Sequence, residues 1–140
     1  MALRLSLDTT FLIDLQRERS RSEIDGPAHR FLKRSPDAEL FLSAVALGEF
    51  AEGFSSTEHP VVRMVRQQHS LLPVDEETAL LYAGLVRDLR SQGRLIGTND
   101  LWIGASSLRF RLPILTANVD HFRRIDGLEV LAYRDNPLPA

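Results

Sequence analysis

Hydrophobic positions follow two different periods at the start of the chain. Leucines alternate with polar residues over 3–7, which is the spacing of a β-strand, and the segment ends at Asp8. Residues 10–19 then carry apolar side chains at the spacing of a helix, at Phe11, Leu12 and Leu15. The first nineteen residues therefore predict a strand, a tight turn and a helix.

This strand and helix unit recurs along the chain. Short apolar runs predict further strands over 39–42, 71–74, 114–116 and 128–131. Helices are predicted over 44–54, 76–91 and 99–110, following the candidate capping residues Ser43, Asp75 and Thr98. Strands separated by helices of this length pair in parallel through right-handed crossovers. The predicted fold class is α/β, a three-layer α/β/α sandwich with a mainly parallel central sheet.

Composition narrows the class of protein. The 140 residues fit a single domain, 1–140, in which 136–140, with two prolines, form a loose tail. No cysteine is present, which excludes disulfides, thiolate zinc sites and a cysteine nucleophile. No apolar run reaches the roughly 20 residues that a membrane helix needs, and the start leads into a strand instead of a signal peptide. We expect a cytoplasmic protein without membrane contact.

The net charge of −2 argues against a protein that mainly coats nucleic acid, because such proteins carry a strongly basic surface. It leaves RNA chemistry open. Lys33 is the one lysine among the 17 basic residues. Arginine suits phosphate recognition, although genomic base composition explains the bias equally well.

Acidic and amide side chains follow the predicted strands. In open parallel sheets the functional crevice lies beyond the carboxyl ends of the strands. Asp8 follows the first strand, Asp100 lies in the first turn of a helix, and Asn118 and Asp120 follow the fourth strand. Taken singly, Asp8 is equally well explained as a helix cap and Asp100 by the helix dipole.

Glu49 is more informative, because it lies on the same predicted helix face as Val45, Ala46 and Phe50. We expect this glutamate to face the core. A buried carboxylate requires a partner, which is either a metal or an internal arginine. Together with Asp8 and Asp100 it would supply clustered oxygen donors, which repel one another unless a cation such as Mg²⁺ or Mn²⁺ neutralises them. Such a site suits phosphodiester hydrolysis.

Four segments of the chain together resemble the acidic motifs of PIN-domain ribonucleases, in particular the VapC toxins of toxin–antitoxin pairs. They are LDTT at 7–10, SAVALGE at 43–49, NDLWIGA at 99–105 and LTANVDHF at 115–122. Each motif is weak alone, but the ordered set is fairly specific and spans nearly the whole chain.

The resemblance implies a PIN-like fold and a Mg²⁺- or Mn²⁺-dependent endoribonuclease. Its catalytic set would be Asp8, Glu49, Asp100 and Asn118, with Asp8, Asp100 and Glu49 as metal ligands. Asn118 stands where many members have a fourth aspartate, so a second metal and compensation by Asp120 stay open. The implied partners are an RNA substrate, with tRNA among the candidates, a cognate VapB-like antitoxin and a second copy of the chain in a homodimer.

Other polar residues near these motifs have two interpretations. Thr10 and Thr116 either hydrogen-bond the acidic cluster or act as cap and strand-end residues. For His121 we favour an exposed residue at a helix start over a general base. We expect Trp102 to pack against other side chains and Arg124 to lie on a solvated helix face.

Three alternatives compete with the toxin hypothesis. A phosphoaspartate protein also carries an aspartate after its first strand, but it needs a late lysine, and Lys33 comes too early. A non-catalytic PIN-like interaction module would keep the fold without cleaving RNA, and Asn118 keeps this alternative open. A PIN nuclease for ribosomal-RNA processing would usually carry additional domains.

Overall fold

Five parallel strands form the centre of the protein in a computed structural model that describes residues 2–135. In chain order they are β1 Arg4–Leu7, β2 Glu39–Ser43, β3 Ser70–Leu72, β4 Ile114–Thr116 and β5 Val130–Ala132. Their order in the sheet is β3-β2-β1-β4-β5. The first strand is therefore central, with β2 and β4 as its neighbours.

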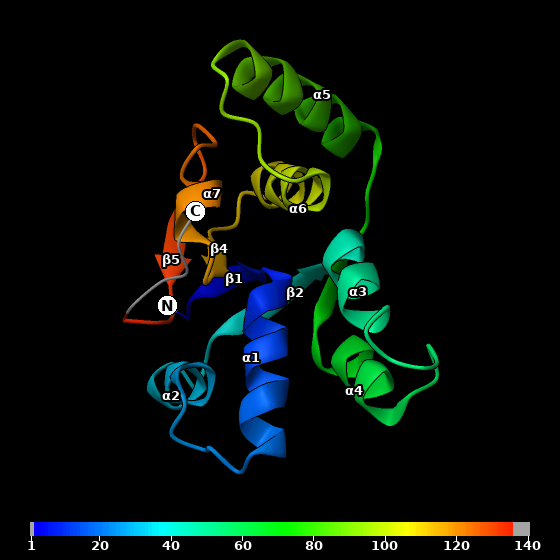
Figure 1. The fold of residues 1–140 in the computed structure, drawn as a ribbon, viewed down its shortest axis with the longest axis vertical. Helices are drawn as coiled ribbons and strands as arrows, with labels where there is room; N and C mark the ends of the chain where they lie inside the picture. The colour runs from blue at the N-terminus through cyan, green and yellow to red at the C-terminus, as the bar shows by residue number, and fades with distance from the viewer. Residues whose placement is uncertain (1, 136–140) are drawn as a thin grey trace.

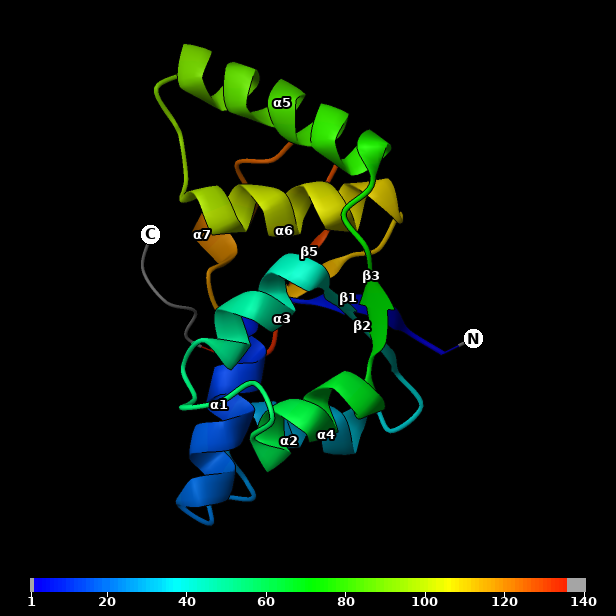
Figure 2. The same cartoon turned by 90° about the vertical axis from the view of Figure 1, so that its right-hand side faces the viewer.

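Helices cover both faces of this sheet (Figures 1 and 2). They are α1 Thr9–Ser20, α2 Pro27–Arg34, α3 Ala44–Ala51, α4 Pro60–Gln68, α5 Glu76–Ser91, α6 Thr98–Arg109 and α7 Val119–Phe122. Helices α1 and α2 lie on one side and α6 on the other, with α5 packed on the outside of α6. The predicted α/β/α class is confirmed, and every pairing in the described sheet is parallel.

The central strands are buried on both faces, as parallel strands under two helix layers must be. Leu7 pairs in register with Leu42 of β2 and Leu115 of β4, and all three side chains are fully buried. Residues that directly follow these strands are thereby brought to one edge of the sheet. Helix α3 contacts both α1 and α6 and so lies beside the same edge.

The structure corrects several element boundaries. The third strand ends at Leu72 instead of 74, because Pro73 has no backbone N–H to continue the ladder. Gly97, not Thr98, is the N-cap of α6, and no side chain caps that helix. The pattern analysis did not predict α2 and α4, each of which carries proline at its first position, a known start signal.

The predicted tail at 136–140 lies outside the described residues. Within the part of the chain that the structure describes, no helix is long and apolar enough to cross a membrane.

Candidate active site

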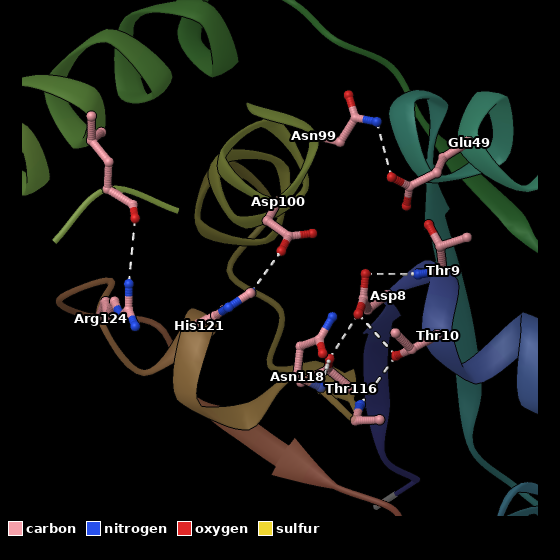
Figure 3. A network of polar contacts seen from close by, with 12 residues as sticks. Asp8, Thr9, Thr10, Glu49, Asn99, Asp100, Thr116, Asn118, His121 and Arg124 are labelled. Atoms are coloured by element: carbon pink, nitrogen blue, oxygen red, sulfur yellow. Dashed lines mark hydrogen bonds and ion pairs between the residues drawn. The ribbon is translucent and has the colours of Figure 1, made fainter. Parts of the chain in front are cut away.

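Asp8 stands at the junction of β1 and α1 and is only 1% exposed. It is the N-cap of α1, since its Oδ1 accepts a hydrogen bond from the Thr9 amide at 2.8 Å. Its Oδ2 accepts from the hydroxyls of Thr10 at 2.9 Å and Thr116 at 2.7 Å (Figure 3). The capping interpretation of Asp8 is correct, but it accounts for only one of three hydrogen bonds.

The two threonines connect Asp8 to the end of β4. The Thr10 hydroxyl accepts from the Ala117 amide at 3.1 Å, and the Thr116 hydroxyl accepts from the Asn118 amide at 2.8 Å. Because each oxygen accepts a backbone N–H, its own hydrogen is left to point at the carboxylate. Both threonines therefore hydrogen-bond the acidic cluster, and the orientation of Asp8 is fixed from two sides.

Asp100 approaches from the opposite helix layer, in the first turn of α6, with a side chain that is 17% exposed. His121 of α7 lies beside it, with its Nδ1 3.2 Å from Oδ2 of Asp100. The expectation of an exposed histidine was wrong, since the imidazole is 29% exposed and in contact with a carboxylate. The sequence pattern indicated the burial of His121 only weakly, because α7 is only four residues long.

Glu49 was predicted to face the core, but it lies half-buried near the end of α3. Its Oε2 accepts a hydrogen bond from the side-chain amide of Asn99 at 2.9 Å. In Figure 3 the carboxylates of Asp8, Asp100 and Glu49 point towards one common space, although Asp8 comes from the β1–α1 junction, Asp100 from α6 and Glu49 from α3. Within the described residues the hydrogen-bond partner of Glu49 is thus an amide and not the arginine that was one of the two predicted partners.

The fourth predicted residue, Asn118, is half-buried at the start of α7 and lies beside Asp8 and Thr116 (Figure 3). Its side chain makes no capping hydrogen bond to α7. Asp120, two residues further on, is exposed. The structure thus brings Asp8, Glu49, Asp100 and Asn118 into one region.

The pKa values of Asp8 and Asp100 are both raised. Burial raises the pKa of Asp8 to about 6, and the charge of Asp100 adds to this effect against the opposing hydrogen bonds from the threonines. Burial also raises the pKa of Asp100, and Glu49 raises it further while His121 opposes the shift. The folded chain therefore concentrates negative charge where its ionisation is unfavourable, which a cation would relieve.

The donor set fits a hard divalent cation with few protein ligands. Asp8 uses three of the roughly four acceptor positions of a carboxylate, so about one remains free. Among residues 2–135, no group of three or more acidic or histidine side chains is close enough to share one ion. Mg²⁺ is commonly held by one or two carboxylates, with water completing its coordination. Asp8 and Asp100, whose charges interact, are two carboxylates that could hold such an ion.

Two other predicted positions have structural partners. Trp102 stacks on Tyr82 of α5 with ring centroids 3.8 Å apart and an interplanar angle of 4°, which confirms packing. Arg124 was expected on a solvated helix face, but its guanidinium donates to the carbonyls of Arg94 and Leu95. It thereby links the turn after α7 to the loop before α6 (Figure 3).

Comparison with known families identifies the class of protein that carries this fold and this acidic cluster. The model of the PIN domain matches residues 5–128, which include all four acidic motifs. The chain belongs to the PIN domain family.

Within that family the similar proteins are VapC ribonucleases. The chain is 30% identical over 128 residues to Ribonuclease VapC1 of Haemophilus influenzae (strain R2866), covering 88% of this chain and 92% of the relative. It is 29% identical over 135 residues to Ribonuclease VapC1 of Rickettsia felis, covering 91% and 94%. The solved structure of VapBC-1 from nontypeable Haemophilus influenzae matches with a TM-score of 0.75 at 28% identity, over 94% of this chain and 98% of that one. The predicted resemblance to VapC is confirmed.

Proposed function

We propose that this protein is a Mg²⁺- or Mn²⁺-dependent endoribonuclease and the toxin of a type II toxin–antitoxin module. The observation that carries the proposal is the convergence of Asp8, Asp100 and Glu49 on one space in a PIN fold. The VapC ribonucleases among its relatives support the same activity. Retention of all three acids disfavours a non-catalytic interaction module.

Asp8 and Asp100 would hold the divalent cation, with Glu49 completing the acidic set. Such a cation activates water and stabilises negative charge on the phosphate during phosphodiester hydrolysis. The chain's own residues supply the arrangement: the threonines fix Asp8, and His121 holds Asp100. Glu49 would accept a hydrogen bond from the attacking water, and the amide of Asn118 would contact RNA or solvent in the site.

A VapB-like antitoxin is the proposed protein partner, because the structures that the chain resembles include VapBC complexes. A short upstream reading frame for a DNA-binding protein would support this part of the proposal. For the proposed homodimer, α5 offers a candidate surface: Leu80 is 66% exposed and Leu81 37%. A Cβ added at Gly84 on the same helix would have no neighbour within 4 Å, so packing within the chain does not explain the glycine at this position.

RNA cleavage by the purified protein tests the proposed activity. Total RNA is incubated with Mg²⁺ or Mn²⁺, beside an EDTA control and the variants Asp8→Asn and Asp100→Asn. Discrete fragments should appear only with metal and intact acids. Asp37→Asn is the matched control, because Asp37 is an exposed acid that precedes β2 and so lies at the opposite edge of the sheet from the cluster. Equal inactivity of wild type and both site variants, together with no stabilisation by metal, would favour the interaction module.

A further inference from the structure

Among residues 2–135, Asn99 makes the one side-chain hydrogen bond that the structure records for Glu49. Its Nδ2 donates to Oε2 of Glu49 at 2.9 Å, and the bond joins the start of α6 to the end of α3 (Figure 3). Both residues are accessible to solvent. The contact therefore connects two helices whose acids, Asp100 and Glu49, belong to the same cluster.

Local helix requirements do not explain this asparagine. Asparagine is favoured at the N-cap, where its side chain satisfies a backbone N–H, and is a weak helix former elsewhere. Here Gly97 is the N-cap and Asn99 is the second residue of α6, and no side chain caps the start of the helix. The amide is directed at Glu49 instead.

Glu49 needs such a contact to stay in place. A glutamate side chain has several rotatable bonds, and holding it in one conformation costs up to about 2 kcal/mol of side-chain entropy. Repulsion between the like charges of Glu49 and Asp100, which face the same space in Figure 3, adds to that cost. Without a donor on the cluster side, the carboxylate would turn towards solvent.

The chemical type of the donor also matters. An amide N–H holds Glu49 without neutralising its charge, so the carboxylate keeps its attraction for a cation. A lysine at this position would pair with Glu49 and compete with the cation. An aspartate would offer no N–H and would add a further negative charge to the cluster.

We propose that Asn99 is a positioning residue that holds Glu49 in the acidic cluster and thereby raises the affinity of the site for a divalent cation. The inference rests on the proposed function, because it assumes that the cluster binds such an ion. It concerns the orientation of Glu49, and the fold itself does not depend on it.

Mn²⁺ binding to the folded, RNA-free protein tests the inference without relying on activity. Free Mn²⁺ is followed by electron paramagnetic resonance during titration of wild type and of Asn99→Leu, which keeps a similar shape but has no donor. We expect about a 10-fold loss of Mn²⁺ affinity, the lower end of the effect of removing an outer partner of a metal ligand. Asn99→Asp should lose at least as much, and Asn99→Gln, which retains the amide, should recover part of the affinity.

A double-mutant cycle separates positioning from a general structural effect. In a Glu49→Gln background, Asn99→Leu should cause no further loss, and Thr98→Ala, an exposed neighbour on α6, should bind Mn²⁺ like wild type. Melting curves without metal check that each variant is folded.

Two results would overturn the inference, and they can be told apart. If wild type binds Mn²⁺ through Asp8 and Asp100 while Asn99→Leu binds it equally well, only the role of Asn99 is refuted. If wild type itself binds no Mn²⁺, the metal-dependent function fails and this inference fails with it.

Discussion

Replacing Asp8 by asparagine should stabilise the metal-free protein while abolishing its activity. Asp8 is buried, and its pKa is raised from 3.8 to about 6. A shift of roughly two units corresponds to about 3 kcal/mol of unfavourable free energy for the ionised carboxylate in the folded state at neutral pH. The neutral amide avoids this cost.

The substitution also has a smaller cost. Three hydrogen bonds reach the two carboxylate oxygens of Asp8, and an amide has a single oxygen, so at least one bond is lost. A lost hydrogen bond costs about 1 kcal/mol, and asparagine caps a helix as well as aspartate does. The net gain is therefore about 2 kcal/mol at neutral pH, which corresponds to a rise in Tm of roughly 6 °C for a domain of this size.

Thermal unfolding in EDTA across pH measures this effect. Between pH 3.8 and about 6 the folded wild type binds more protons than the unfolded chain, so its stability falls as pH rises through this window. The gain of Asp8→Asn should be full above about pH 6 and should disappear near pH 4. Saturating Mg²⁺ should stabilise wild type and leave the variant unchanged. If the variant is less stable than wild type at neutral pH without metal, the argument from burial is wrong.

The remaining predictions concern the scaffold. Gly104→Ala should destabilise the fold by about 1–3 kcal/mol, because the added Cβ would lie 2.4 Å from Cδ1 of Ile125. Gly48→Ala, whose added Cβ has no neighbour within 4 Å, should be neutral or stabilising. Urea unfolding compares the free energies of unfolding of the two variants. Tyr133→Phe removes a hydrogen bond donated to buried Asp14, which keeps its ion pair with Arg134, and should cost about 1–3 kcal/mol in the same assay. The pKa of Asp75 is lowered to about 2 by its hydrogen bonds from Arg109 and Thr78. Its contribution to stability is therefore complete above pH 3.8 and is lost as pH falls towards 2. Asp75→Asn should reduce the dependence of the melting temperature on pH across that window. Leu80→Lys on the exposed face of α5 should convert a dimer to a monomer in light scattering. Leu3→Lys, at a site that is 45% exposed and distant from α5 in the sequence, should not. An unchanged mass for Leu80→Lys would exclude this face of α5 as the dimer interface.

Local patterns were sufficient for much of the fold. The alternation over 3–7 and the helical spacing after it predicted β1 and α1, and all five strands lie within two residues of their predicted positions. Periodicity is a local property, so it needs no tertiary information. Helices α2 and α4 escaped the pattern analysis, although proline at the first position of each is a start signal.

The composition of the site was also predictable, but the environment of each acid was not. The four motifs identified Asp8, Glu49, Asp100 and Asn118 as candidates, and the structure brings them together. Glu49 shows the limit of the argument: its helical neighbours indicated burial, yet it lies half-buried and its carboxylate is hydrogen-bonded by Asn99 of the neighbouring helix α6.

By itself, the sequence determined the class of the fold, its five strands, helices α1, α3, α5 and α6, and the candidate acids of the site. Only the tertiary structure decided which side chains surround each acid, because those contacts join residues far apart in the chain. Thr116 reaches Asp8 since β1 and β4 are adjacent in the sheet, and Asn99 reaches Glu49 since α3 and α6 pack together. Parallel pairing places distant strand ends at one edge, and that non-local arrangement is what turns four separate motifs into one site.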